Sequence, residues 1–390
     1  MRSLKYKELI PHIVTYGEKF EELDLTDFRI VESMCRLGVR NTRKVAHSIG
    51  LSQQVMSYRV RRFEENDLVR FRAVIDEAKL GLKNYVVIAN VSPAELETGS
   101  NAMTCFPLWR YLALVDGWKH GNYVRYLIPP DREKDLEAFL CELTTKALIL
   151  DYEIFPTTNP AYPFPNLGFY AKSKKTPVFN WSKWVNDLDT YERERLEEPA
   201  LYGNAIFDLY DLLILRSLQI NARMRFRNIA VEIARTVGEH NYRRFISLVS
   251  RRFARHIIAQ QLIRGYRAYV FPSLSSSVLF LIFRFRFRNA SVMQKFISGL
   301  RNLPYITVYQ KVLADYVLFI HFVIPIYEYS TMNKAFVKLA ENGIIRESHL
   351  LLGDMVRGSW DNVELHQMYK NGRWSFNYEI ALKALEKSLT

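Results

Sequence analysis

Residues 23–82 read LDLTDFRIVESMCRLGVRNTRKVAHSIGLSQQVMSYRVRRFEENDLVRFRAVIDEAKLGL, and this stretch decides the fold. Asp24 or Thr26 can cap a helix that runs to about position 37, because short polar side chains accept the free amide hydrogens of a first turn. A shorter helix is expected over 42–48, and Gly50 after it suits a left-handed turn. The spacing therefore predicts two helices that meet at a tight corner.

A third helix should follow that corner, because Ser52 is a good cap for a helix through about Asn66. A basic strand pair over 68–75 comes next. Helix, short helix, glycine turn, capped helix and basic strand together predict a winged helix-turn-helix unit.

The second half of the chain repeats landmarks of the first half in the same order. LDLTD at 23–27 is matched by FDLYD at 207–211, an offset of 184 residues. The further matches are Val45-Ala46 with Ile229-Ala230, Arg61-Arg62-Phe63 with Arg251-Arg252-Phe253, Phe71-Arg72-Ala73-Val74 with Tyr266-Arg267-Ala268-Tyr269, GNYVRYLIP (121–129) with ADYVLFIHFVIP (314–325), and Ala138-Phe139 with Ala335-Phe336. Ordered matches of this kind indicate a tandem duplication.

Each copy continues with strand and helix patterns in the order βαββαβ of a ferredoxin-like domain. The predicted fold class is therefore α+β, with two winged helix-turn-helix domains each followed by a ferredoxin-like domain. The expected divisions are an N-terminal extension (1–22), winged helix-turn-helix 1 (23–80), ferredoxin-like domain 1 (81–156), a linker rich in proline and aromatic residues (157–206), winged helix-turn-helix 2 (207–272), ferredoxin-like domain 2 (273–353) and a C-terminal tail (354–390).

Three further segments carry local signals. Proline density in the linker predicts an extended connector without regular helix or strand. In FRFRFR at 283–288, strand periodicity predicts phenylalanines that face a core and arginines that face outward, with a nucleic-acid ribbon as the alternative. In copy two, Thr236 and Glu239 have the spacing of a capping box at a helix start.

The stretch 23–82 resembles the DNA-binding half of the Lrp/AsnC family. The resemblance rests on the LD..D start, the Ala-x-x-x-Gly-Leu-Ser turn of Ala46 to Ser52, the recognition-helix pattern and the RA.ID…LG wing that ends near Gly81. It implies a tandem-duplicated transcription regulator whose ferredoxin-like parts serve effector binding and assembly. It also implies that Gly121 and Asn122 lie at the hairpin where the family binds amino-acid-like effectors; an ordinary β-turn is the alternative.

The positive charge is concentrated on the two helix-turn-helix units. The chain carries a net charge of +13, and residues 36–72 hold nine Arg or Lys against three acids, while 216–267 hold twelve Arg against two acids. This is the distribution expected when phosphate neutralisation supplies affinity for double-stranded DNA. Copy one is predicted to read bases, and copy two mainly to contact the phosphate backbone. The DNA-binding candidates are Ser52, Gln53, Gln54, Ser57, Tyr58, Arg59, Arg61, Arg62, Arg70, Arg72, Arg243, Arg244, Arg251 and Arg252.

Other classes of protein receive little support from the residues. Three widely spaced cysteines argue against a disulfide framework, and no Cys/His cluster has zinc-site spacing. No apolar run is long enough to span a bilayer. We therefore predict no catalytic residues, no metal and no cofactor, and a cytoplasmic, nucleoid-associated protein that forms an intramolecular pseudo-dimer or a homo-oligomer.

One enzymatic alternative stays open. Siroheme decarboxylases resemble the same regulator family and also pair two such modules. An enzyme of that kind would need a cationic pocket for tetrapyrrole carboxylates with a histidine nearby, and His120 with Arg125 is the candidate pair. The basic helix-turn-helix units favour DNA binding over this alternative, so the sequence predicts a protein that is not an enzyme.

Overall fold

The computed structural model describes residues 22–169, 179–191, 202–269, 278–354 and 359–389. The first helix-turn-helix unit comprises α2 (Leu25–Leu37), α3 (Thr42–Ser48) and α4 (Gln53–Glu65), followed by strand β1 (Arg70–Ile75). Asp24 and Asp27 form a capping box at the start of α2, and Ser52 caps α4 as expected. These caps satisfy amide hydrogens that the first turn leaves without partners.

The second unit repeats this arrangement with α8 (Leu209–Ile220), α9 (Phe226–Thr236), α10 (Arg243–Arg252) and β6 (Ile263–Tyr269). Its capping box is formed by Asp208 and Asp211, at the positions that the duplication predicts. The predicted helix start at Thr236 is wrong, because Thr236 ends α9 and its hydroxyl donates to the carbonyl oxygen of Glu232. A helix turn already uses that side chain, so it is not free to cap the next helix.

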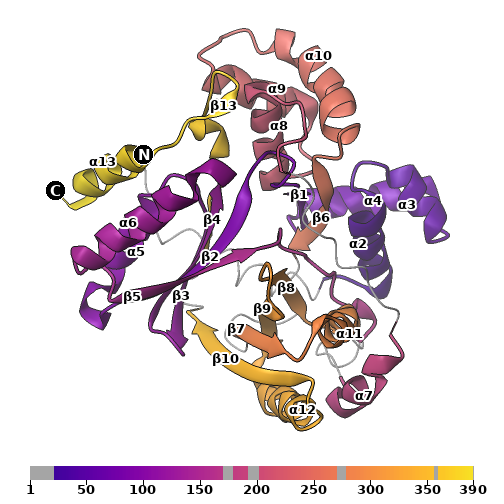
Figure 1. Cartoon of the computed structure of the whole chain (residues 1–390). Helices are drawn as coiled ribbons and strands as arrows, with labels where there is room; N and C mark the ends of the chain where they lie inside the picture. The colour runs from indigo at the N-terminus through magenta and orange to yellow at the C-terminus, as the bar shows by residue number, and fades with distance from the viewer. Residues whose placement is uncertain (1–21, 170–178, 192–201, 270–277, 355–358, 390) are drawn as a thin grey trace.

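The two wings join the copies. Strands β1 and β6 form an antiparallel ribbon in which Arg72 lies opposite Arg267 (Figure 1). A reciprocal pair of hydrogen bonds connects the helix-turn-helix units: Arg40 donates to the carbonyl oxygen of Met224 at 2.6 Å, and Arg223 donates to that of Val39 at 2.5 Å. Both bonds span 184 residues, the offset of the duplication, so the copies meet through equivalent surfaces, as in a two-fold dimer.

Each copy then forms a ferredoxin-like βαββαβ unit, so the predicted α+β fold with two winged helix-turn-helix domains and two ferredoxin-like domains is confirmed. The first unit consists of β2 (Lys83–Asn90), α5 (Leu96–Thr104), β3 (Trp109–Gly117), β4 (Gly121–Ile128), α6 (Glu133–Thr145) and β5 (Asp151–Thr157). The second consists of β7 (Val278–Phe287), α11 (Ala290–Leu300), β8 (Ile306–Lys311), β9 (Val317–Pro325), α12 (Tyr329–Glu341) and β10 (Ile345–Gly353).

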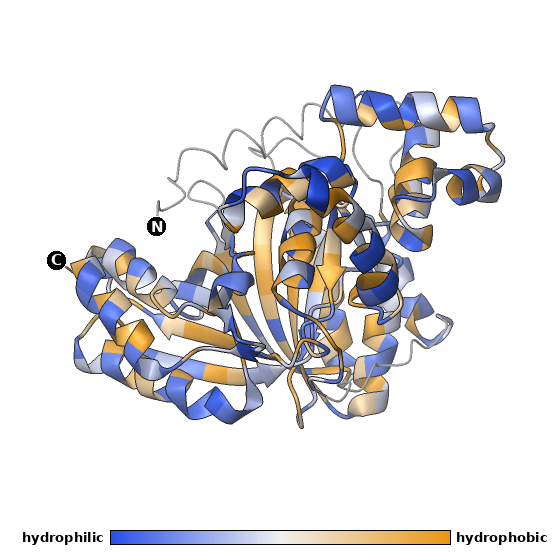
Figure 2. Cartoon of the chain, turned by 90° about the horizontal axis from the view of Figure 1, so that it is seen from above, coloured by the Kyte–Doolittle hydropathy of each residue, from blue (hydrophilic) through white to orange (hydrophobic). Residues whose placement is uncertain are grey.

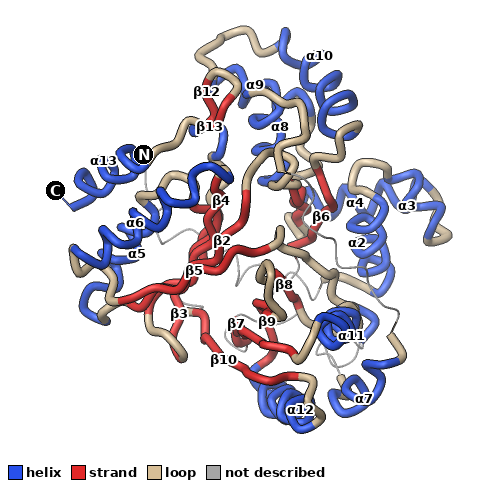
Figure 3. Tube along the Cα trace, viewed as in Figure 1, coloured by secondary structure: helices blue, strands red, loops and turns tan. Residues whose placement is uncertain are grey.

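The two four-stranded sheets combine into one closed sheet. The strand order is β5-β2-β4-β3-β10-β7-β9-β8, and bridges from Thr157 to Val312 and from Ala161 to Tyr309 join its two ends. The strands surround a common interior, and the helices lie outside them (Figure 3). Long orange stretches of the strands in Figure 2 show how apolar this sheet is. Aromatic rings fill the interior, including Tyr123 and Phe319 at 6.0 Å between centroids.

The FRFRFR segment in β7 follows the strand periodicity. Phe283, Phe285 and Phe287 are buried in the second core. Arg284 and Arg286 point to the other face, where Arg286 forms ion pairs with Asp315 and Glu347. Alternation in a strand places successive side chains on opposite faces, and here both faces lie within the protein.

The described parts of the linker and the tail pack onto the two copies, and residues 170–178, 192–201 and 355–358 lie outside the described residues. The linker contains α7 (Trp181–Asn186), which corrects the prediction that prolines exclude a helix there; α7 lies in a stretch without proline, and its tryptophans are buried. The tail contains β11 (Ser359–Asp361), β12 (Tyr369–Lys370), β13 (Arg373–Trp374) and α13 (Tyr378–Leu389). Short helical turns are η1 (Pro93–Glu95), η2 (Pro130–Arg132), η3 (Leu167–Phe169), η4 (Asp187–Asp189), η5 (Phe253–Ile258), η7 (Ile326–Glu328) and η8 (Leu365–Met368).

Candidate anion-binding site

A hollow lies where the wing ribbon meets the closed sheet. The ribbon contributes Arg72 and Arg267, and β3 contributes Arg110. Tyr162, from the chain after β5, and Asp361, from β11, complete the charged and aromatic part of its wall. The hollow has an empty volume of about 380 Å³, including the space at its open mouth. Both copies therefore build one site at their junction.

Asp361 is the centre of the arginine contacts in this hollow. Its Oδ2 lies 3.2 Å from Nη1 of Arg72 and 3.3 Å from Nη2 of Arg267, and its Oδ1 lies 3.9 Å from Nη1 of Arg110. Strand β11 brings it there by pairing with β3, where Asp361 lies opposite Tyr111. A residue of the tail thus carries the carboxylate that the three arginines share.

Glu77 is the second carboxylate of this cluster and lies deeper. Its Oε1 and Oε2 accept from the guanidinium of Arg125 at 3.2 Å, and Nε of Arg110 lies 3.5 Å away. Glu77 and Arg125 are only 3% and 4% exposed. We call Arg72, Arg110, Arg125 and Arg267, with Glu77 and Asp361, the arginine site.

Guanidinium groups outnumber carboxylates in the arginine site. Burial raises the pKa of Asp361, but Arg267, Arg110 and Arg72 outweigh it, so the pKa lies below its ordinary value. Burial lowers the pKa of Arg267, and Tyr269, Tyr162 and Asp361 raise it above the ordinary value. Asp361 and Arg267 are therefore charged at neutral pH. Four cations around two carboxylates leave an excess of positive charge in a region of lower dielectric, which favours an added anion.

His321 and Tyr123 lie inside the closed sheet, near Arg125 of the arginine site, with ring centroids 4.8 Å apart. Nε2 of His321 and the hydroxyl of Tyr123 are buried, with no hydrogen-bond partner among the described residues. Burial, with a smaller contribution from Arg125, lowers the pKa of His321 to about 3. His321 is therefore neutral at pH 7.

This shift makes the stability depend on pH in a defined window. Between pH 6.5 and about 3 the unfolded chain protonates this histidine and the folded protein does not. His321 should therefore lower the free energy of unfolding by up to about 1.4 kcal/mol for each pH unit of acidification in that window. In His321→Phe this contribution should vanish, whereas the exposed-site variant His47→Ala should keep the wild-type slope. Equal slopes for wild type and His321→Phe in denaturant titrations would refute the assignment.

The predicted DNA-binding residues of copy one fall into two groups. Ser52, Gln53, Gln54, Ser57, Tyr58 and Arg61 are exposed on α4. Arg59 and Arg62 instead form ion pairs with the capping-box acids, Arg59 with Asp27 at 2.7 Å and Arg62 with Asp27 at 2.5 Å. Arg70 lies 3.2 Å from Asp67, and Arg72 belongs to the arginine site.

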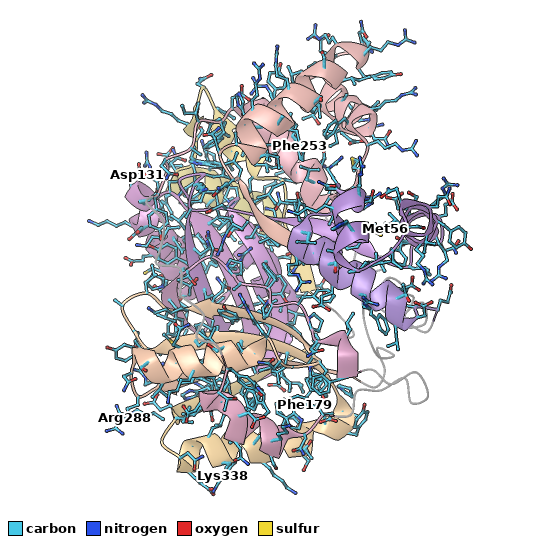
Figure 4. The ribbon with its side chains drawn as sticks, turned by 90° about the vertical axis from the view of Figure 1, so that its right-hand side faces the viewer. Met56, Asp131, Phe179, Phe253, Arg288 and Lys338 are labelled. Atoms are coloured by element: carbon cyan, nitrogen blue, oxygen red, sulfur yellow. The ribbon has the colours of Figure 1, made fainter. Side chains whose placement is uncertain are left out.

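The copy-two candidates divide in the same way. Arg243 and Arg251 are exposed on α10, and Arg244 is exposed but lies 2.6 Å from Glu239. Arg252 pairs with Asp208 at 2.7 Å and Asp211 at 3.1 Å. In Figure 4, Phe253 of the second unit and Met56 of the first mark two neighbouring groups of helices, far from Arg288 and Lys338 at the other end.

The remaining predicted residues lie elsewhere. Gly121 and Asn122 are buried at the start of β4, where Asn122 Oδ1 accepts a hydrogen bond from Ser100. His120 pairs with Asp116 in the β3–β4 hairpin. Five residues of extended strand, about 16 Å, separate His120 from Arg125, so the suggested His120–Arg125 pair is not brought together. His321 is the histidine that lies near Arg125.

Sequence reasoning missed Arg110, Arg267, Glu77 and Asp361 as parts of one site. Arg267 could have been found from the duplication, because the stretch around Arg267 in copy two matches the stretch around Arg72 in copy one. No spacing signal points to Asp361, which lies 289 residues from Arg72 along the chain and reaches it only through the tail.

Several solved structures align with this chain at low identity. The siroheme decarboxylase NirDL aligns with 94% of this chain and 99% of its own, at 12% identity and a TM-score of 0.48. An AsnC family transcriptional regulator from Agrobacterium tumefaciens aligns with 34% of this chain and 89% of its own, at 22% identity and a TM-score of 0.29. AsnC from E. coli aligns with 34% and 91%, at 13% identity and a TM-score of 0.26.

No family model and no curated protein matches the sequence. The prediction that the chain is not an enzyme is contradicted by two structures of an enzyme that align along most of its length: NirDL, and NirDL in complex with an iron-uroporphyrin III analogue, the latter over 90% of this chain. The regulators align with about a third of it.

Among the described residues, no helix is both long and apolar enough to cross a membrane. Among the same residues, no group of three or more His, Cys, Asp or Glu side chains is arranged to hold a metal ion.

Proposed function

We propose that this chain is an enzyme of the siroheme decarboxylase type, which binds a substrate rich in carboxylates at the arginine site. The observation that supports this proposal most strongly is that Arg72, Arg110 and Arg267 all line one open hollow. Guanidinium groups bind carboxylates through paired N–H donors, and fixed arginines orient a substrate without reorganisation. A tetrapyrrole with acidic side chains presents several carboxylates on one edge.

The proposed chemistry needs little besides orientation and one proton. The reacting carboxylate leaves as CO2, its bonding electron pair stays on carbon, and a proton takes its place. Tyr162 lines the hollow and is the hydroxyl group that we assign to proton delivery. Arg267 lies over its ring at 4.7 Å, which fixes the ring beside the guanidinium groups.

The size of the hollow limits how a tetrapyrrole would bind. The 380 Å³ includes open solvent at the mouth, and the enclosed part of about 20 Å³ has room for little more than one carboxylate on an edge of the macrocycle. The remainder would lie across the mouth. The aromatic rings that fill the closed sheet favour this edge-on binding over a position inside it.

The test is incubation of the purified chain with siroheme without oxygen, followed by mass spectrometry of the tetrapyrrole. We expect products lighter by the mass of one CO2 per event. Tyr162→Phe should bind the tetrapyrrole with unchanged absorbance shifts but form product more slowly. Unchanged siroheme after prolonged incubation, with no absorbance shift on mixing, would overturn the proposal.

A second candidate function is DNA binding, with α4 reading bases and α10 contacting phosphates. The observation that favours it is the exposed polar face of α4, on which Gln54 and Tyr58 lie. Gel shifts over a salt series test it: affinity should fall steeply as salt rises. Tyr58→Ala should lessen discrimination between sequences, whereas Arg251→Ala should weaken all duplexes alike. Absence of salt-sensitive duplex binding would exclude this function.

A further inference from the structure

Asp27 and Asp361 each contact more than one arginine, but they are held very differently. Asp27, at the capping box of α2, is fully buried and lies 2.5 and 2.7 Å from two arginines. Asp361 is a quarter exposed, and its arginine contacts are 3.2, 3.3 and 3.9 Å long. Charged hydrogen bonds of full strength are shorter than 3 Å. Asp361 is therefore surrounded by cations without being tightly bound to any of them.

The position of Asp361 makes its side chain exchangeable. It forms part of the wall of the open hollow, so a ligand from solvent reaches the same guanidinium groups. Its carboxylate is on a short, partly exposed side chain, so rotation about χ1 would take it away from the arginines.

The backbone on the C-terminal side of Asp361 is firmly attached. The amide nitrogen of Asn362 donates to the carbonyl oxygen of Arg110 at 3.0 Å, and Nη1 of Arg110 donates to the carbonyl oxygen of Asn362 at 2.7 Å. The side-chain amide of Asn362 donates to the carbonyl oxygen of Trp109 at 3.0 Å. The strand therefore keeps Asp361 next to the site whether or not its carboxylate stays in place.

We infer that the Asp361 carboxylate is an internal stand-in for a ligand carboxylate. It occupies the subsite formed by Arg72 and Arg267, which lie opposite each other in the ribbon, and a ligand carboxylate displaces it on binding. The ligand class is an organic acid with at least two carboxylates, because one replaces Asp361 and another meets the remaining excess of positive charge in the arginine site. The inference rests on the proposed function in taking the arginine site as the ligand site.

The stand-in explains how so many arginines coexist before the ligand arrives. Without Asp361, Arg72 and Arg267 would have no carboxylate partner among the described residues, and Arg110 would keep Glu77 on its deeper side. Like charges in a partly buried cluster repel one another. A displaceable carboxylate reduces that repulsion, and it also weakens binding, because every ligand must compete with it.

The test compares Asp361→Asn with wild type by thermal unfolding in succinate and in chloride of equal ionic strength. Asparagine keeps the shape and removes the charge, so the variant should melt lower than wild type in chloride. Succinate should raise its melting temperature by at least about 2 °C more than it raises that of wild type. Asp361→Ala gives the same comparison with more open space. Glu364→Gln is the matched control, because Glu364 lies in the same tail and pairs with Arg216 outside the hollow.

In a titration with iron uroporphyrin, Asp361→Asn should bind about tenfold more tightly than wild type, since the internal competitor is gone. The inference is overturned if succinate stabilises Asp361→Asn no more than wild type and Glu364→Gln. If the chain decarboxylates siroheme but succinate stabilises Asp361→Asn no more than wild type, the proposed function stands and the stand-in role of Asp361 is refuted. Selective succinate stabilisation without decarboxylation would keep the stand-in and refute the proposed function.

Discussion

Replacement of Glu77 by glutamine is expected to lower the free energy of unfolding by about 3–5 kcal/mol. Glu77 is the carboxylate between Arg110 and Arg125, and all three side chains are at most 10% exposed. Glutamine keeps the size of the side chain but leaves two buried guanidinium groups without their shared counter-charge. Removal of one partner from a buried ion pair strongly destabilises the folded protein, because the other charge stays buried without a counter-charge.

Denaturant titrations would measure this loss against the control Glu65→Gln, which removes an exposed carboxylate from α4 and should leave stability within about 0.5 kcal/mol of wild type. Adding Arg125→Met to Glu77→Gln should recover part of the loss, because the unpaired cation is then absent. A change in Glu77→Gln as small as that in Glu65→Gln would show that the arginine site is held together by other contacts.

The second large effect is expected on ligand binding. Arg72→Gln with Arg267→Gln should weaken binding of iron uroporphyrin about 100-fold, since each lost charged hydrogen bond is worth about 1.5 kcal/mol, or roughly tenfold. Absorbance titrations measure the change, and circular dichroism verifies the fold. The control is Arg243→Gln with Arg251→Gln, which removes the same charge from exposed positions of α10. Equal weakening by both double variants would indicate general attraction to positive charge rather than a defined site.

Local signals in the sequence predicted local structure well. Ser52 caps α4, Gly50 has a positive φ of 70°, and the duplicated LDLTD and FDLYD stretches both end in capping boxes. Alternation in FRFRFR gave the correct buried face of β7. These features depend on neighbours a few residues away, which the sequence displays directly.

The arginine site depends on contacts that no local pattern displays. Arg72 and Arg267 become neighbours only because the two wings pair, and Asp361 reaches them because the tail adds a strand beside β3. The capping box gives a second example. The sequence pattern predicted Arg59 and Arg62 as DNA contacts, but it could not show that both form ion pairs with Asp27. Charge counts locate basic segments, but they do not tell which cations already have counter-charges.

The structure of the chain with iron uroporphyrin bound tests the central claim most directly. We expect density for a carboxylate between Arg72 and Arg267, with the Asp361 side chain rotated away and the rest of the tetrapyrrole across the mouth of the hollow. A tetrapyrrole bound elsewhere on the protein, with Asp361 still between the two arginines, would contradict it.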